Sequence, residues 1–469
     1  MKYLPVKALV VLLSLVGFSV NAAEVIVEPG TGTLKAAVDA ASAGDTIVLK
    51  DGDYIMVGMA VTKDLDFKAQ TNTSPRITTG SSNSTQRTIT LGSTSTPVSV
   101  SFTGIQFAGM TLATLSGAED VELIIAESRI TNSAFATSTI TDSPAVLESL
   151  IFIGNVVTGS PLSFQARDMI VAGNTFVLPD NDGGSYNISA RATAHVIGNE
   201  FRADYVRGTM LLIQSGQNYV AANRFYWNFA EGSDIPIQSN GSYTVLYLSG
   251  AITRVQLNNN LFKIVLPAEF QPDPGDPLDN TNLQFIKVVD NDITSDFGVT
   301  FENNTVDFGM TADTVNFVQT SPVIETSSAV IVRNNLIANT TRPLIDFTST
   351  PAIDASVIEF NMCDTVLPDL CYGSDVVAGS ADFVDADDYV LGASSDATDA
   401  GKPLGLYNDV DGTRNDLGAY GGAFPIDQYD VQRTDGRVEP FLYPLFTPNK
   451  NVTGDGKLNV RVIGLARSK

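Results

Sequence analysis

The sequence is poor in the residues that most often hold metals or perform nucleophilic catalysis. Its 469 residues include one histidine, His195, together with two cysteines and one tryptophan. A single histidine argues against a metal site built from several histidines and against a Ser-His-Asp triad. Two cysteines are also too few to form the framework of a fold of this length.

Long apolar runs are absent beyond the first 22 residues, so no membrane-spanning helix is predicted. The opening MKYLPVKALVVLLSLVGFSVNAAEV places Lys2 and Lys7 ahead of a short apolar stretch that ends in small residues. This pattern predicts a secretory signal peptide over residues 1–22. We therefore expect a soluble, monomeric protein that is secreted or exported to a bacterial periplasm.

Basic residues are scarce, with 28 Lys and Arg against 52 Asp and Glu and a net charge of −24. This imbalance argues against nucleic acids and anionic membranes as partners. A polyanionic sugar would bind only through a local basic patch or through calcium. In an exported chain, Cys363 and Cys371 predict a small disulfide loop, and a free buried Cys363 is the alternative.

A short asparagine motif recurs along the middle of the chain, as in FIGNVV, VAGNTF, VIGNEF and VIVRNNLIAN. The spacing between successive motifs is mostly that of one coil of a solenoid, although the longest interval could hold two coils. The aligned asparagines are Asn155, Asn174, Asn199, Asn223, Asn260, Asn304, Asn335 and Asn361.

The positions three before and two after each aligned asparagine are always apolar. This alternation predicts a strand, a bend at the asparagine and a second strand, with both apolar columns facing one continuous core. Asparagine suits the bend because it tolerates left-handed backbone and can bond to its equivalents in a ladder. The pattern favours an all-β solenoid of parallel strands over a helical bundle.

The flanking segments predict how the solenoid begins and ends. Residues 34–43, LKAAVDAASA, predict an amphipathic helix that caps the first coil within residues 23–60. Coils are expected over residues 61–365, with the proline-rich and acidic stretch 267–280 forming a loop. Residues 366–469 are expected to pack on the last coils as an acidic, turn-rich segment, and GKLNVRVIGLA is expected to be a closing strand.

The stretches TGTLKAAVDAASAGDTIVLKDGDY and SSDATDAGKPLGLYNDVDGTRNDLGAYGG resemble the first and closing segments of proteins of the pectate lyase-like superfamily. They resemble in particular the chondroitinase B and alginate lyase group of that superfamily. This resemblance implies a right-handed parallel β-helix of three sheets, with a groove for an acidic polysaccharide. It also implies β-elimination by a Lys base and an Arg acid beside calcium. The Arg-His-Gly and Lys-Ser stretches of that group are absent, so no catalytic residue is carried over.

The repeat supplies its own candidate site, because the third position after each asparagine should face outward. Arg202, Tyr226 and Lys263 occupy that position on successive coils, and we take them as the candidate catalytic residues. Arg can clamp a carboxylate, and Tyr or Lys can transfer a proton. Substrate binding is assigned to Trp227, Glu200 and Arg224. The alternative is an ordinary solvated strand face, and Arg167, Arg191, Arg207 and Lys287 are further candidate cations.

Calcium is a candidate cofactor, because two acidic turns offer the oxygen ligands that it prefers. One turn contains Asp409, Asp411 and Asp416, and the other contains Asp273, Asp276 and Asp279. The alternative for each is a soluble acidic turn. Two functions stay open at this point: a polysaccharide lyase that acts on uronate chains, and a non-catalytic β-helix that binds carbohydrate or another surface.

Overall fold

A computed structural model describes most of the chain from Ala22 onward. The described ranges are 22–80, 84–131, 133–136, 147–159, 162–178, 186–204, 208–228, 242–265, 282–289, 298–307, 319–320, 322–326, 328–338, 344–347, 356–364, 371, 373–385, 388–422, 424–429, 441–445 and 461–465. The predicted signal peptide, the loop at 267–280 and its three aspartates lie outside these ranges. No helix in the described part has the length and apolar character that a membrane crossing requires.

The larger of two parallel sheets has 21 described strands. Its strands are β1 (Glu24–Val27), β3 (Asp45–Leu49), β5 (Met59–Val61), β6 (Leu65–Ala69), β8 (Thr88–Leu91), β9 (Val98–Thr103), β11 (Thr111–Thr114), β12 (Val121–Ala126), β14 (Ala134–Ala136), β15 (Leu147–Ile153), β17 (Ser163–Ala172), β19 (Tyr186–Ile197), β21 (Gly208–Ala221), β23 (Ser242–Asn258), β25 (Asn282–Val289), β26 (Val299–Glu302), β28 (Gln319–Thr320), β29 (Ile324–Thr326), β30 (Val330–Arg333), β32 (Ile345–Phe347) and β33 (Val357–Glu359).

The smaller parallel sheet has 13 described strands. Its strands are β2 (Gly30–Thr31), β4 (Asp53–Met56), β7 (Arg76–Thr79), β10 (Gln106–Ala108), β13 (Arg129–Thr131), β16 (Val156–Thr158), β18 (Thr175–Leu178), β20 (Glu200–Asp204), β22 (Arg224–Asn228), β24 (Leu261–Val265), β27 (Thr305–Asp307), β31 (Leu336–Ala338) and β34 (Met362–Asp364). The remaining elements are the helix α1 (Thr33–Ala40), the 3-10 helices η1 (Ser84–Arg87) and η4 (Ile426–Tyr429), and the antiparallel pairs β35 (Phe383–Asp385) with β36 (Val390–Leu391) and β37 (Phe441–Leu445) with β38 (Arg461–Leu465).

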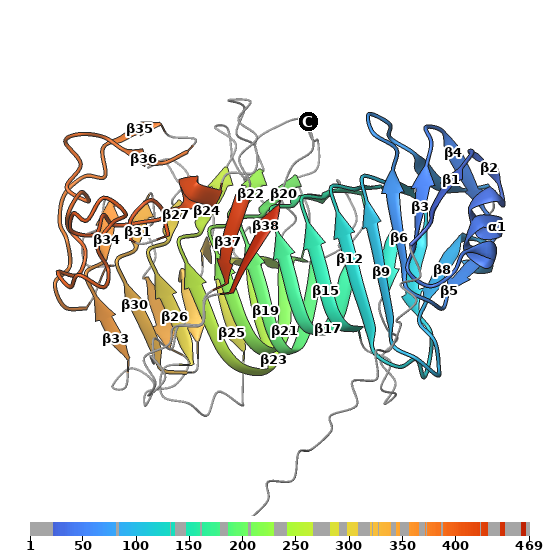
Figure 1. The fold of residues 1–469 in the computed structure, drawn as a ribbon. Coiled ribbons are helices and arrows are strands. Elements are labelled where there is room, and N and C mark those ends of the chain that lie inside the picture. Colours follow the sequence, from blue (N-terminus) through green and yellow to red (C-terminus); the bar gives the residue numbers. More distant parts are fainter. Residues whose placement is uncertain are drawn as a thin grey trace, which may run out of the picture.

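Each strand of these two sheets pairs in parallel with the equivalent strand of the next coil, which gives the elongated solenoid of Figure 1. The predicted right-handed parallel β-helix is confirmed. Two of the three implied sheets are joined in the larger sheet. The long strands β17, β19 and β21 contain register shifts but stay hydrogen-bonded on both sides of them. The expected closing strand, β38, instead pairs antiparallel with β37.

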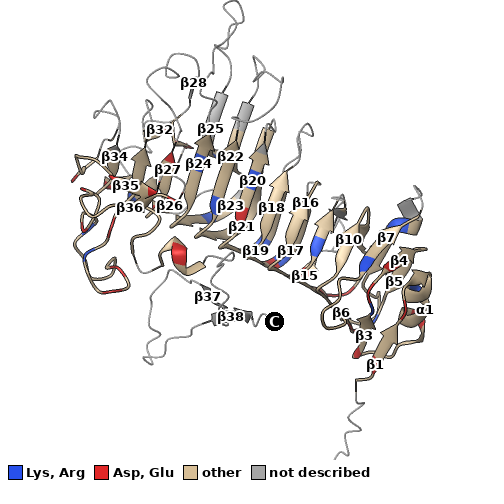
Figure 2. Cartoon of the chain, turned by 90° about the horizontal axis from the view of Figure 1, so that it is seen from above, with Lys and Arg blue, Asp and Glu red and all other residues tan. Residues whose placement is uncertain are grey.

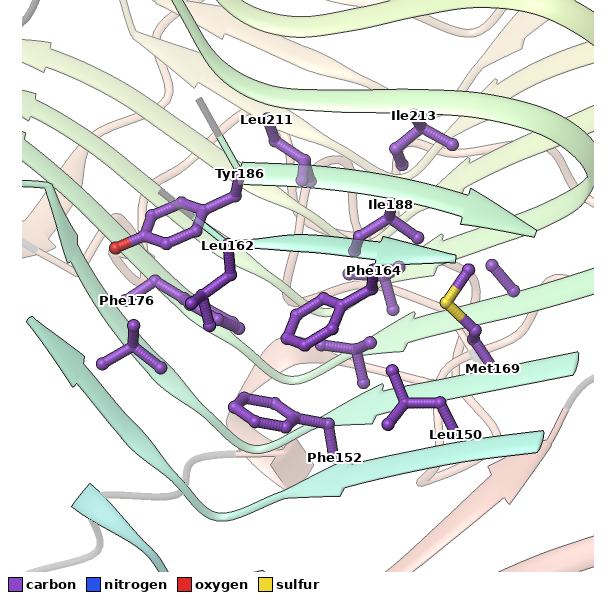
Figure 3. Packing of buried hydrophobic residues seen from close by; sticks show 14 of the residues in the cluster. Leu150, Phe152, Leu162, Phe164, Met169, Phe176, Tyr186, Ile188, Leu211 and Ile213 are labelled. Atoms are coloured by element: carbon purple, nitrogen blue, oxygen red, sulfur yellow. The ribbon is translucent and has the colours of Figure 1, made fainter. Parts of the chain in front are cut away.

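The apolar columns fill the interior between the sheets, as Figure 3 shows for neighbouring coils. Phe176, Phe201, Phe225 and Phe262 stand two residues after their asparagines, and their rings stack at centroid distances of 4.8, 4.9 and 4.8 Å. Parallel strands lie roughly 4.8 Å apart, so one ring per coil forms a continuous stack.

The asparagine ladder is present and buried. The Asn223 side-chain oxygen accepts from the backbone N–H and the amide of Asn199, both at 2.9 Å. Its own amide donates to the carbonyl of Val196 at 2.8 Å and to Asn260 at 3.0 Å. Leu261 pairs directly with Thr305, so the 44-residue interval after Asn260 is a single coil.

The left-handed bend residue is not the ladder asparagine, which corrects the predicted role. Positive φ angles fall one position earlier, at Gly154, Gly173, Gly198, Ala222, Asn259, Asn303, Asn334 and Phe360. Glycine and asparagine are common there because they adopt this conformation at the least cost. In a double asparagine, therefore, the first residue bends the coil and the second forms the ladder.

The first coil is covered by α1, at one end of the solenoid in Figure 1, and Leu34 and Val38 are buried in the main core. Residues 388–422 and 424–429 lie along the bends of the coils, where Ala419 and Ile426 share an apolar cluster with Ile153 and Leu261. The Asn259 amide donates to the carbonyls of Ala419 and Gly421 at 3.1 and 2.6 Å. The first asparagine of such a pair thus also anchors the C-terminal segment.

Candidate functional site

The smaller sheet turns one face outward, and this face carries the predicted site. In the strand register Arg202 is opposite Tyr226, and Tyr226 is opposite Lys263. Glu200 is opposite Arg224 two residues earlier on the same strands. The predicted alignment on neighbouring coils is therefore confirmed, and we call these five residues the basic strip. Figure 2 shows basic segments on β20 and β24 of this sheet.

Arg202 is the most open cation of the basic strip, with 54% of its side chain exposed. Its Nε donates to the carboxylate of Glu200, and its guanidinium carbon lies 5.8 Å from the centre of the Tyr226 ring. Its partner Glu200 is much less exposed, at 13%. The guanidinium is therefore held in place by Glu200 and Tyr226 while it keeps further N–H groups that could bind an anion.

The C-terminal segment forms a wall beside the basic strip. Lys263 Nζ lies 5.2 Å from the centre of the Tyr389 ring, and the Tyr389 hydroxyl donates to the carboxylate of Asp307 on the next coil. Arg224 forms a hydrogen bond with the hydroxyl of Tyr420. The site thus combines side chains from β20, β22 and β24 with aromatic residues about 130 to 220 positions later.

Burial sets the protonation of the two central phenols. Burial raises the pKa of Tyr226 to about 12, and Arg224 partly offsets that rise. Burial also raises the pKa of Tyr420 to about 12, again against the effect of Arg224. Both hydroxyls therefore keep their protons at neutral pH, so either can donate a hydrogen bond or a proton but neither is a base.

The assignment of Trp227 to the site is wrong. Its side chain is 1% exposed and lies in the main core. The position follows from strand alternation: Phe225 points inward, so Trp227, two residues later, points inward as well. No sugar ring can stack on it without opening the sheet.

The predicted calcium site at Asp409, Asp411 and Asp416 is not formed. Within the described ranges, no group of three or more acidic, histidine or cysteine side chains is arranged to hold a metal. The carboxylates instead accept turn hydrogen bonds: Asp409 from the N–H of Asp416 at 3.0 Å, and Asp411 from that of Thr413 at 2.9 Å. The turn is a structural element that holds the closing segment.

The two cysteines form the predicted disulfide. Cys363 and Cys371 are bonded, with their Cα atoms 5.7 Å apart. Cys363 follows the last ladder asparagine by two residues, so the bond ties the final described coil to the segment that covers it. The disulfide has a structural role and lies apart from the basic strip.

Two of the other candidate cations form ion pairs on the larger sheet, away from the basic strip. Arg167 Nη1 donates to Glu148 at 2.7 Å, and Lys287 Nζ lies 3.7 Å from Glu325. Arg191 is exposed on β19, and Arg207 lies outside the described residues. None of the three described residues joins the basic strip.

Sequence reasoning missed two polar groupings on the larger sheet. Tyr247, Lys287, Glu325 and Asp346 follow one another in register. His195 stacks on Tyr219, with ring centres 4.8 Å apart. Neither grouping lies at a fixed offset from the ladder asparagines that the repeat could reveal, since the strands before the bend differ in length.

The chain resembles solved polysaccharide lyases, at low identity. A pectate lyase, Pel9A, matches with 13% identity and a TM-score of 0.39, over 85% of this chain and 97% of that one. A family 6 alginate lyase, AlyGC, in a mutant form, matches with 13% identity and a TM-score of 0.32, over 79% and 55% of the two chains. A mannuronic-acid-specific family 6 lyase from human gut microbiota matches with 11% identity and a TM-score of 0.26, over 76% and 92%.

No protein-family model and no curated protein matches the sequence. The structural matches are too distant to place catalytic residues on this chain. The assignment of the fold rests on the strand pairing itself, and the candidate site rests on the register and contacts of the basic strip.

Proposed function

We propose that the protein binds an acidic polysaccharide along the basic strip. The observation that carries this proposal is the register that sets Arg202, Arg224 and Lys263 on three consecutive strands of one outward face. A chain with a net charge of −24 repels polyanions in general, so a local group of cations is what such a ligand requires. Arg clamps carboxylates with paired hydrogen bonds, which suits uronate sugars.

Binding should depend on the two arginines individually. A hydrogen bond to a charged group contributes about 1.5–3 kcal/mol, and each 1.4 kcal/mol corresponds to about a tenfold change in affinity. Arg202→Ala and Arg224→Ala should each weaken binding to pectate or alginate by about tenfold or more. Arg167→Ala is the matched control, because it removes another exposed, ion-paired arginine from the larger sheet.

A lyase acting on uronate chains is the more specific proposal, and the protonated phenol of Tyr226 favours it. In β-elimination a base takes the proton beside the carboxylate, the bond to the leaving oxygen breaks as a double bond forms, and that oxygen accepts a proton. Arg202 and Arg224 would neutralise the carboxylate, and Tyr226 would protonate the leaving oxygen. Lys263 is the candidate base, once it has released its own ammonium proton.

The test follows ultraviolet absorbance of the unsaturated product from alginate, pectate and chondroitin sulfates, with and without calcium, at neutral and alkaline pH. Product formed by the wild type and lost in Tyr226→Phe, with binding retained, supports the lyase. Binding without product on every substrate supports the non-catalytic carbohydrate-binding alternative. Absence of both binding and product would overturn the proposal for the basic strip.

We also propose that the chain is exported and that residues 1–22 are removed as a signal peptide. The charged start, short apolar stretch and disulfide between Cys363 and Cys371 support this. Amino-terminal sequencing of the secreted protein should begin near Ala23. An intact amino terminus on a protein kept in the cytoplasm would contradict it.

A further inference from the structure

Exposure falls from Arg202 onward along the column of residues to which the basic strip belongs. The register runs from Thr158 through Val177, Arg202, Tyr226 and Lys263 to Asp307 and Ala338. Thr158 and Arg202 are exposed, Tyr226 and Lys263 are half-buried, and Asp307 and Ala338 are 6% and 2% exposed. The face is therefore open toward the earlier coils and closed toward the later ones.

The closure is made by the C-terminal segment and is well packed. Tyr389, Ala419 and Ile426 are buried in one apolar cluster with residues beside the bends of successive coils, from Ile153 to Leu261. The backbone N–H of Ala419 donates to the hydroxyl of Thr305 at 2.9 Å, on the strand that follows β24. Because this cover is fixed by apolar packing and hydrogen bonds, it forms a wall on the face where Tyr389 lies against Lys263 and Ala419 bonds to Thr305.

Charge changes sign along the same direction. Arg202 lies on the open side, Arg224 and Lys263 lie beside the wall at Tyr420 and Tyr389, and the carboxylate of Asp307 is bound by Tyr389 behind it. Asp388 also lies close enough to Tyr226 and Tyr420 to influence both phenols. A uronate carboxylate is therefore favoured in front of the wall, beside these cations, and disfavoured beyond it at Asp307. The phenols and Asp388 at the wall can form hydrogen bonds with sugar hydroxyls.

We propose that the basic strip receives one terminus of an acidic polysaccharide chain, with the terminal sugar against the wall formed by Tyr389 and Tyr420. This inference rests on the proposed binding function and adds that the middle of a chain does not fit. The carboxylates of the terminal sugars meet Arg224 and Arg202, and the hydroxyl group that only a chain end carries meets the wall. The rest of the chain leaves along β18 and β16.

The experiment measures how many protein molecules bind to each chain of size-fractionated oligogalacturonate or oligomannuronate, by sedimentation and titration calorimetry. Binding to one terminus predicts one protein per chain at every length. It also predicts that fragmentation of a polymer increases its competing power in proportion to the number of chains. A number of bound proteins that rises with chain length would overturn terminal binding and leave the proposed function intact. No binding to any length would instead overturn the proposed function.

The wall itself is tested with a pair of variants at one position. Tyr389→Phe keeps the ring that lies against Lys263, whereas Tyr389→Ala removes it. If the wall confines binding to a terminus, Tyr389→Ala should raise the number of proteins bound per long chain above that of Tyr389→Phe. The wild-type stoichiometry on its own decides the inference if Tyr389→Ala does not fold. If Tyr389→Phe and Tyr389→Ala both fold and both bind several proteins per long chain in equal number, the role of the wall is contradicted.

Discussion

Replacement of one ladder asparagine by alanine should destabilise the whole solenoid. Asn223→Ala removes four hydrogen bonds within the buried ladder, which connect it to Asn199, Val196 and Asn260. The Asn260 oxygen keeps one donor, because it still accepts from the backbone N–H of residue 223. Three buried groups then lose a partner: the N–H of Asn199, one amide hydrogen of Asn199 and the carbonyl of Val196.

The expected loss follows from those three groups. A buried polar group without a partner costs about 1–3 kcal/mol, so three such groups, with partial relaxation, correspond to about 4 kcal/mol. This is a large part of the roughly 5–15 kcal/mol by which a domain is usually stable. Thr158→Ala is the control, because Thr158 is exposed on β16 of the smaller sheet and should change stability by less than about 0.5 kcal/mol.

Urea unfolding followed by circular dichroism measures both variants. Asn223→Ala should unfold at a clearly lower urea concentration than Thr158→Ala, with the slope of the transition unchanged. A loss below about 1 kcal/mol, equal to that of the control, would refute the reasoning. It would mean that water replaces the lost partners, and that the ladder is not an essential part of the core.

Three further perturbations address the C-terminal segment. Arg333 is 8% exposed, pairs with Glu302 and Glu359 and donates to the hydroxyl of Tyr407. Arg333→Met should leave Glu302 without this partner, whereas Glu359 keeps Lys402, and should cost about 3 kcal/mol and speed proteolysis near residue 400. Unchanged cleavage would contradict this. Burial raises the pKa of Asp409 to about 6 in the folded protein, above its ordinary 3.8. The stabilising contribution of the protonated group is therefore complete below pH 3.8 and is lost as pH rises through about 6. Asp409→Asn should remove that part of the pH dependence of the unfolding temperature, and an unaltered pH profile would count against this. The bond between Cys363 and Cys371 closes a loop of 8 residues, so its reduction should lower the free energy of unfolding by about 2.5 kcal/mol if the loss is one of chain entropy. A Cys363→Ser, Cys371→Ser double variant as stable as the wild type would refute this.

The repeat made the coils predictable because its chemistry is local and periodic. A buried asparagine with apolar residues at fixed offsets determines strand, bend and facing direction, and from these follows the register that aligns Arg202, Tyr226 and Lys263. The same alternation would have placed Trp227 in the core, had it been applied one residue further. The bend residue was missed because glycine, alanine, asparagine and phenylalanine all occupy that position.

The cover over the later coils could not be predicted from the repeat. Asn259 and Ala419 are 160 residues apart, and no periodicity connects them. Double asparagines carried an unused signal, since the first member anchors the C-terminal segment at Asn259 and Asn303. The acidic turn at Asp409 was equally ambiguous, because calcium loops and hydrogen-bonded turns both need clustered aspartates and glycine.

The most direct measurement of the central claim is the affinity of the Arg202→Ala, Arg224→Ala double variant for pectate and alginate, beside the wild type and Arg167→Ala. The basic strip predicts binding that weakens with salt in the wild type and in Arg167→Ala, as charge-driven binding does. It predicts a loss of about a hundredfold or more in the double variant, from about 1.5–3 kcal/mol for each arginine. Equal affinity of all three proteins would contradict the assignment of this face as the binding site.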